Sequence, residues 1–433
     1  MDREQSNTPL EQLKQHSAKE EQEFRKLIPV TGFFGEYMKY TDHQESPGSF
    51  HFWVAASVLS AVLQRRAWVS KGVYNVYPNI FMILVAPSGT CRKSRALNLG
   101  TDLIHDFDFV NIVADKTTPE ALLEALMVGS DNLNKTDTDE QGRQVINLQV
   151  DSTGFIKAGE LSVFLNKQTY TSGMVNLLTD LYDCPQSFKY QTRNKKLVKL
   201  RNVAVTFVGA STPDWLATSL PEAAFEGGFM SRILFVVKYY KDRSIALPMD
   251  PPKGMVESLQ RRLMEIRKLH RGRIELTQGA RNWYLDWYDN LEYTPLEDES
   301  LRGFLERKPD LVLKMGLLLS ASYSPVDKLI SKDHLIQANE IISWTQARMF
   351  HAFKEVDLTH IGRLIHKVRD ILEQYGAVTR RNIMRKLGSR INGVNELEEV
   401  EKIMEESGEL MVEHIVPEKG GKTSIVYRRP NNE

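Results

Sequence analysis

The most constraining feature of the sequence is an uninterrupted apolar run at residues 80–85, followed by a short polar loop and a helical segment. Such a run, Ile-Phe-Met-Ile-Leu-Val, is typical of a strand buried on both faces of a parallel sheet. Helical patterns alternate with four further strand candidates, at residues 110–113, 154–158, 203–209 and 233–237. The sequence therefore predicts an α/β core over residues 50–245.

The regions on either side of this core have different patterns. Residues 1–49 are predicted to form a polar helical tail and a linker, and residues 246–354 a helical lid domain with helices at 256–269, 278–291 and 311–322. Residues 355–433 show three helices and then a hairpin that pairs 410–416 with 424–428. Thr379 is placed to cap the second of these helices. This is the layout of a winged helix-turn-helix.

Charge and cysteine content exclude several classes of protein. Lys plus Arg and Asp plus Glu both total 56 in 433 residues, so a bulk polycation is excluded and any nucleic-acid binding must come from local patches. The charged start argues against a secretory signal, and no apolar run is long enough to span a bilayer. The two cysteines, Cys91 and Cys184, show no metal-ligand spacing. We therefore expect a cytoplasmic protein without a zinc site.

The loop after the apolar run has the context of a phosphate-binding loop. Residues 86–94 read Ala-Pro-Ser-Gly-Thr-Cys-Arg-Lys-Ser, and a helix follows. Backbone N–H groups and the dipole at a helix start favour phosphate. We expect the loop to bind ATP through Pro87, Ser88, Gly89, Thr90, Cys91, Arg92, Lys93 and Ser94. Lys93 would reach the β- and γ-phosphates, and the Ser94 hydroxyl would bind Mg²⁺.

The glycine pattern of this loop is incomplete. Counting back from Lys93, Pro87 and Arg92 occupy the positions where a P-loop has glycines, and Gly89 remains. The motif alone leaves an ordinary strand-turn-helix as likely as nucleotide binding. A second Lys-Thr pair at 422–423 follows no buried strand and is predicted to be part of a wing turn.

Polar residues after the later strands favour the nucleotide interpretation. Glu160 follows a strand, where this fold class places the carboxylate that polarises the attacking water. Ser211 and Thr212 follow the next strand, where a polar residue contacts the γ-phosphate or the water. Arg232 precedes the last strand and is placed to act as an arginine finger on a neighbouring subunit's γ-phosphate.

The motifs together resemble a known family. His-Phe-Trp at 51–53, Tyr-Pro-Asn at 77–79, Pro-Ser-Gly at 87–89, Arg-Lys-Ser at 92–94 and Gly-Phe-Met-Ser-Arg at 228–232 resemble phage and mobile-element P-loop ATPases of the primase-helicase or helicase-like type. The resemblance covers residues 50 to about 325. The motif order is also similar to AAA+ helicases such as the minichromosome maintenance proteins, which carry a C-terminal winged helix. The resemblance implies a Mg²⁺-dependent AAA+-type ATPase that forms a ring, expected to be a hexamer, on DNA.

One departure from the family pattern concerns the metal. The Asp that usually precedes the catalytic Glu is Gly159 here. Asp183 is a candidate substitute that would support Mg²⁺ together with Ser94. The departure leaves open slow hydrolysis or nucleotide binding without turnover.

A basic stretch before the Ser211 strand is the candidate DNA contact. Residues 186–201 contain six basic residues and no acidic one, with aromatic residues interleaved. In helicases of the resembling kind, a hairpin here enters the ring pore and grips a single strand. Charge neutralisation and base stacking are the chemistry of such binding. The candidates are Lys189, Tyr190, Arg193, Lys195, Lys196 and Lys199, and the alternative is a solvated surface hairpin.

Charge is segregated within the C-terminal region. Residues 363–390 carry eight basic and two acidic side chains, whereas 396–413 carry eight Glu and one Lys. The acidic helix occupies the position that usually reads the major groove, where it would repel phosphate. We expect DNA contacts through Arg380, Arg381 and Arg385 and the wing at Lys419 and Lys422, or else a protein-binding or structural role.

These observations lead to one main hypothesis and two alternatives. The main hypothesis is a ring-forming replicative helicase or translocase of a phage or mobile element, acting on single-stranded or forked DNA, with a primase or other replication proteins as further partners. The first alternative is a nucleotide-gated helicase loader or initiator that does not unwind DNA. The second is a catalytically inactive scaffold. No primase active site is visible in the sequence.

Overall fold

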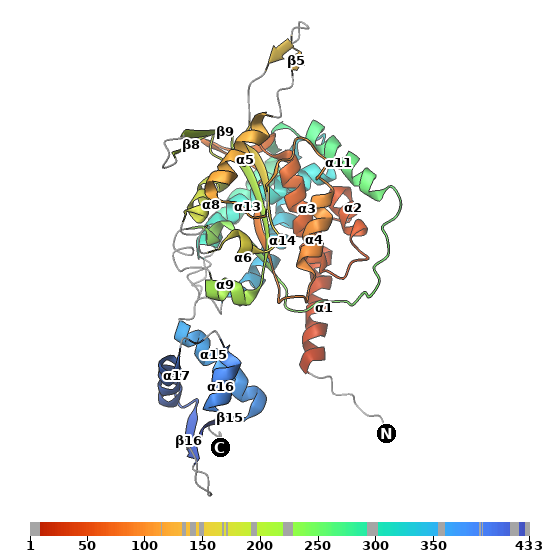
Figure 1. The fold of residues 1–433 in the computed structure, drawn as a ribbon. Helices are drawn as coiled ribbons and strands as arrows, with labels where there is room; N and C mark the ends of the chain where they lie inside the picture. Colours follow the sequence, from red (N-terminus) through yellow and green to blue (C-terminus); the bar gives the residue numbers. More distant parts are fainter. Residues whose placement is uncertain are drawn as a thin grey trace, which may run out of the picture. The chain divides into compact units, whose positions relative to one another are not determined.

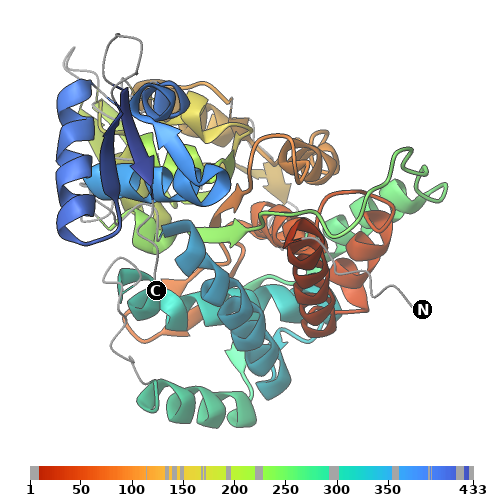
Figure 2. The same ribbon diagram turned by 90° about the horizontal axis from the view of Figure 1, so that it is seen from below.

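We describe the chain from a computed structural model (Figures 1 and 2). It describes residues 9–113, 115–131, 136–138, 144–146, 151–166, 169, 172–191, 197–219, 228–291, 302–353, 360–388, 391, 393–415 and 424–428. The chain divides into two compact units, Met1–Ala352 and Phe353–Glu433. No helix among the described residues is both long and apolar enough to cross a bilayer.

The first unit contains a central parallel sheet, as the sequence predicts. Within the described residues it has five strands in the order β11-β3-β10-β7-β4. Their bounds are β3 (Phe81–Val85), β4 (Ile112–Val113), β7 (Thr153–Ala158), β10 (Ala204–Ser211) and β11 (Leu234–Val237). Every residue of β3 and β10 is buried, because helices cover both faces of the sheet. Figure 1 shows α3 and α4 on one side of the sheet and α8 on the other.

The helix before the sheet is a core helix. Helix α3 (Gly48–Leu63) is buried along its whole length, as expected for the apolar segment in this region. It lies against the sheet and the helices α1 (Pro9–Leu27), α2 (Gly32–Tyr40) and α4 (Lys93–Asp102). The helix predicted within residues 1–49 includes α1, and it is partly buried, because Glu21 and Phe24 are both at most 1% exposed.

The region after β11 packs onto this core. Its long helices are α11 (Met255–Leu269), α12 (Gln278–Asp289), α13 (Arg302–Tyr323) and α14 (Lys332–Phe353). The Ser322 hydroxyl accepts a hydrogen bond from the Phe34 amide at 3.0 Å, and Trp53 donates to Thr345 at 3.1 Å. The predicted lid, residues 246–354, belongs up to Ala352 to the same compact unit as the sheet.

The remaining elements of the first unit are short. The helices are α5 (Pro119–Asp131), α6 (Leu161–Phe164), α8 (Met174–Tyr182), α9 (Pro213–Ser219) and the 3-10 helix η1 (Met230–Arg232). Short strands outside the central sheet are β1 (Ala67–Lys71), β2 (Tyr74–Val76), β5 (Thr136–Thr138), β6 (Gln144–Ile146), β8 (Ser187–Gln191), β9 (Leu197–Arg201), β12 (Gly272–Arg273), β13 (Glu275–Leu276) and β14 (Leu329–Ile330). Among these, β8 and β9 form an antiparallel pair on their own.

The second unit has three helices and a small antiparallel sheet. In chain order it contains α15 (His360–Tyr375), β15 (Ala377–Thr379), α16 (Arg380–Leu387), α17 (Val394–Glu406), β16 (Met411–Ile415) and β17 (Ser424–Arg428). The expected hairpin is present, since His414 pairs with Ile425 in the β16–β17 register. Thr379 caps α16 as predicted, accepting a hydrogen bond from the Asn382 amide at 3.3 Å. Strand β15 was not predicted.

Candidate functional site

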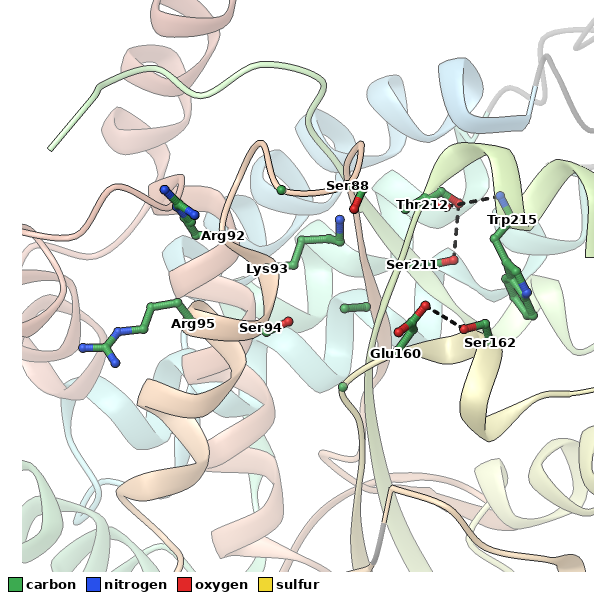
Figure 3. Close-up of a pocket in the computed structure, with 13 residues that line it drawn as sticks. Ser88, Arg92, Lys93, Ser94, Arg95, Glu160, Ser162, Ser211, Thr212 and Trp215 are labelled. Atoms are coloured by element: carbon green, nitrogen blue, oxygen red, sulfur yellow. Dashed lines mark hydrogen bonds between the residues drawn. The ribbon is translucent and has the colours of Figure 1, made fainter. Parts of the chain in front are cut away.

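A cavity of about 370 Å³ lies at the carboxyl ends of β3, β7 and β10. Ligands of open α/β sheets bind in this position. Residues from three separate parts of the chain line it (Figure 3): Ser88, Gly89, Arg92, Lys93, Ser94, Arg95, Gly159, Glu160, Ser162, Ala210, Ser211, Thr212 and Trp215. Most of the residues predicted from the sequence for ATP binding and catalysis therefore meet in one place.

Strand register explains why these segments meet. Ser211 lies opposite Val85, the last residue of β3, and Gly209 lies opposite Ala158, the last residue of β7. The loop after β3 and the Glu160 turn after β7 therefore flank the end of β10. A hydrogen bond of 3.3 Å from the Ala86 amide to the Ser211 carbonyl joins the loop to this strand.

The loop after β3 is a tight turn. The carbonyl oxygen of Pro87 accepts hydrogen bonds from the Thr90 amide at 3.4 Å and the Thr90 hydroxyl at 2.9 Å. Gly89 has a φ of +73°, a conformation that glycine adopts without strain. The one loop glycine is therefore at a position where the backbone requires it.

Arg92 also has a left-handed backbone, with φ +50° and ψ +40°, at the N-cap of α4. This is the second position where a P-loop has glycine. For a residue with a Cβ this conformation costs roughly 1–2 kcal/mol. Its guanidinium points away from Lys93 and Glu160 in Figure 3 and donates to Glu45 at 2.9 Å.

Lys93 is the first residue of α4, and its ammonium group folds back over the loop. It donates to the carbonyl oxygens of Ala86 at 2.6 Å and Pro87 at 3.2 Å. Burial lowers the pKa of Lys93, and the nearby Cys91 and Glu160 partly oppose this shift. Ser94 follows on the cavity wall. An arriving phosphate could replace the two carbonyl partners without moving the helix.

Glu160 faces the loop from the end of β7. Its Oε1 accepts a hydrogen bond from the Ser162 hydroxyl at 2.8 Å (Figure 3). This bond orients one carboxylate oxygen and leaves the other for a ligand or a water molecule. Ser211 is buried and donates to the Thr212 carbonyl at 3.3 Å, while the Thr212 hydroxyl accepts from the Trp215 amide at 3.3 Å.

Sequence reasoning missed four of the cavity residues: Arg95, Ser162, Ala210 and Trp215. The Trp215 side chain is half-buried beside Ser162 and Glu160, across the cavity from Lys93 (Figure 3). Ser162 holds Glu160. Ser162 and Trp215 could have been found from their positions, because each lies within a few residues of a predicted catalytic group.

Asp183, the metal candidate, lies elsewhere. Its carboxylate accepts from Arg232 at 3.0 Å and contacts Arg307 at 3.6 Å, and it is not among the cavity residues. Arg232 also donates to the Gly228 carbonyl at 2.8 Å. Neither arginine lines the cavity of its own chain.

Asp115 is the carboxylate nearest to the position of the missing acid. A Cβ built on Gly159 would lie 3.4 Å from the Asp115 Oδ2. Asp115 follows β4, which pairs with β7, so both groups are at the same edge of the sheet. Among the described residues, no group of three or more His, Cys, Asp or Glu side chains is arranged to hold a metal ion.

Cys91 contributes packing to the loop. Its side chain is fully buried and contacts the Lys238 carbonyl at 3.8 Å. Burial raises the pKa of this thiol, which favours the neutral thiol over the reactive thiolate.

The basic hairpin β8–β9 separates its lysines from its aromatic residues. Lys189 and Lys199 are exposed and directly opposite each other. Tyr190 is half-buried and pairs with the buried Val198, on the other face of the hairpin. Arg193, Lys195 and Lys196 lie outside the described residues.

In the second unit, acidic side chains bind several of the basic ones. Arg380 contacts Glu398 at 3.0 Å and Glu401 at 2.8 Å, and Arg369 contacts Glu409 at 2.5 Å. Arg381 and Arg385 are exposed. Of the predicted DNA contacts here, Arg380 therefore has acidic partners within the unit, and the wing residues Lys419 and Lys422 lie outside the described residues.

No protein-family model and no curated protein matches the chain. The geometry of the cavity and its surroundings is therefore the basis for a functional proposal.

Proposed function

We propose that the chain is a Mg²⁺-dependent ATPase that acts on DNA. The observation that carries the proposal is the convergence of Lys93, Ser94, Glu160 and Ser211 on one cavity at the carboxyl ends of parallel strands. A cation at a helix start, a hydroxyl beside it and a carboxylate across from it are the groups that phosphoryl transfer to water needs.

Each cavity residue has a role in this proposal. The amides at the start of α4 and the Lys93 ammonium bind the β- and γ-phosphates. Glu160, oriented by Ser162, accepts a hydrogen bond from the attacking water and draws off its proton. Ser211 or Thr212 contacts the water or the γ-phosphate.

The residues present fit a magnesium ion with few protein ligands. Mg²⁺ in nucleotide sites keeps several waters and binds phosphate oxygens with one or two protein groups. Ser94 is one such group. Neither Asp115 nor Asp183 lines the cavity, but Asp115 lies beside Gly159, whereas Asp183 has two arginine partners, so Asp115 is the second candidate. The metal would neutralise the charge that develops on the phosphates.

Two features support DNA as the substrate. Lys189 and Lys199 face each other across β8–β9, an arrangement that disfavours the hairpin until an anion lies between them. The helix and strand order of the second unit, with Thr379 capping α16, resembles that of a winged helix. A ring-forming helicase or translocase of a phage or mobile element would combine these features. In such a ring, Arg232 would have to leave its contact with Asp183 to reach the next subunit's ATP.

A loader or initiator without unwinding activity is the second candidate. Gly159 removes the usual acid beside Glu160, which favours slow turnover. The pairing of Arg380 with the acidic helix α17 also favours a protein-binding role for the second unit. A strand-displacement assay run beside an ATPase assay separates the candidates, since a loader hydrolyses ATP without displacing a strand.

Replacement of Lys93 by Ala tests the nucleotide site. Loss of a charge-assisted contact of about 1.5–3 kcal/mol should weaken ATP binding by roughly 10–150-fold. Lys268→Ala removes an exposed lysine of α11, far along the chain from the cavity, and serves as the control. Undiminished binding and turnover in Lys93→Ala would exclude the assignment.

Particle mass measured with and without an ATP analogue and single-stranded DNA tests the ring.

A further inference from the structure

An ion-pair group outside the loop holds Arg92. Glu45 accepts from the Arg92 Nε at 2.9 Å with one carboxylate oxygen and from the Lys241 Nζ at 2.5 Å with the other. The Glu45 side chain is only 11% exposed, whereas that of Arg92 is 58% exposed, so water reaches the pair from the Arg92 side. The bonds from Lys241 and Arg92 lower the pKa of Glu45 to about 2. Glu45 is therefore a carboxylate with both oxygens in use near neutral pH.

The left-handed backbone conformation of Arg92 is strained, and another interaction has to offset this strain. It occupies the left-handed conformation that a glycine would adopt without strain, and this conformation turns the loop into α4. The side chain cannot cap the helix, because it makes no hydrogen bond to the first turn. Its bond to Glu45 is a charge-assisted contact of the stronger kind.

We propose that Glu45 is a positioning residue of the nucleotide site, which holds Arg92 in the left-handed conformation that the loop needs to bind phosphate. The inference rests on the proposed ATP site. Glu45 fixes the Arg92 backbone through the guanidinium, so that the α4 amides and Lys93 face the cavity. The ion pair thus offsets the cost of the left-handed backbone at Arg92, a cost that glycine avoids because it has no Cβ.

Cys91, the residue before Arg92, contacts the same segment of the chain that carries Lys241. Cys91 is buried against the Lys238 carbonyl, and Lys238 is in turn bound by Glu20 and Glu21 of α1. Lys238 and Lys241 belong to the segment that follows β11. The end of the phosphate loop is therefore attached to this segment both at Cys91 and, through Glu45, at Arg92.

A double-mutant cycle on the full-length chain tests the proposal. The dissociation constant of a fluorescent ATP analogue with Mg²⁺ is measured for wild type, Glu45→Gln, Arg92→Gly and the double variant. Glu45→Gln is expected to weaken binding about tenfold, because the left-handed Arg92 loses its compensation. In the Arg92→Gly background, the same Glu45→Gln change is expected to shift the constant less than twofold, because glycine needs no such partner.

Asp42→Asn is the matched control. Asp42 lies in the same segment as Glu45, but it pairs with Arg25 and Arg243 rather than with the loop. It should leave nucleotide affinity within twofold of wild type. Thermal unfolding of each variant separates loss of affinity from general loss of stability.

Two results would overturn the inference. Wild-type affinity in Glu45→Gln, or an equal loss from Glu45→Gln in both backgrounds, would show that Glu45 does not act through Arg92. Failure of the proposed function has a different signature, in which wild type and Lys93→Ala both fail to bind the analogue or bind it equally well.

Discussion

The β8–β9 hairpin provides the sharpest test of DNA binding. Lys189 and Lys199 are exposed and opposite each other on one face. Like charges in this position destabilise an antiparallel pair. Replacing both lysines by Gln keeps their length and removes the charge. If they bind phosphates, the double replacement should weaken DNA binding without weakening the fold.

The size of the effect follows from counterion release. Each phosphate contact on a single strand contributes about 0.7 to the slope of log K against log salt. Loss of both contacts should reduce that slope by about 1.4. At 0.1 M salt, relative to 1 M, the same contacts account for about 1.4 log units of affinity, so the loss should be about 25-fold.

Fluorescence anisotropy with a labelled oligothymidylate, measured over a range of salt concentrations, gives both quantities. Lys268→Gln on α11 is the control for removal of an exposed charge. Thermal unfolding of the double variant should be unchanged or raised, since the like-charge pair is gone. A salt slope equal to that of wild type, whatever the affinity, would refute phosphate contact by this face.

Four further outcomes are expected. Asp115→Asn should raise the Mg²⁺ concentration needed for half-maximal ATP-analogue binding by about tenfold in a magnesium titration, while metal-free binding stays unchanged. Trp215→Phe should remove the difference in tryptophan fluorescence between the ATP-analogue and ADP complexes, because the indole lies beside Glu160 at the cavity. Thr379→Ala should lower the stability of the second unit by about 1 kcal/mol in urea titrations, through loss of the α16 cap. Burial lowers the pKa of His51 to about 3, so the unfolded chain binds the proton first as the pH falls below about 6.5, and stability should drop by up to about 1.4 kcal/mol per pH unit between 6.5 and 3; His51→Gln should flatten that slope in urea titrations at each pH.

The sheet could be predicted from the sequence because its strands are continuous apolar runs. The predicted run at 80–85 became β3 (Phe81–Val85), and 233–237 became β11 (Leu234–Val237). Strand β15 could not be predicted, because three residues carry no period. Helix α13 begins at Arg302, well before the predicted 311, and it contains Pro309 although proline is unfavourable inside a helix.

Some residues of the candidate site could likewise be predicted from the sequence, and others could not. Glu160, Ser211 and Lys93 could be brought together from sequence, because the carboxyl ends of parallel strands meet at one edge. The residues that hold them in place could not be predicted from the sequence. Glu45 is 47 residues from Arg92 along the chain, and no periodic pattern connects them. The sequence prediction groups Tyr190 with Lys189, although neighbouring residues of a strand point to opposite faces, and the β8–β9 register places them on different faces.

The departures from the family pattern have a shared physical consequence. Glycine adopts a left-handed backbone without help, but Arg92 needs a partner, and that partner is attached to Lys241 after β11. Likewise, the carboxylate nearest Gly159 comes from Asp115, after a different strand. If the loop binds phosphate as proposed, it depends on residues outside its own motif. Movement of the segments that carry Glu45 or Lys241 could therefore change ATP affinity, whereas a glycine-rich loop would respond to such movement far less.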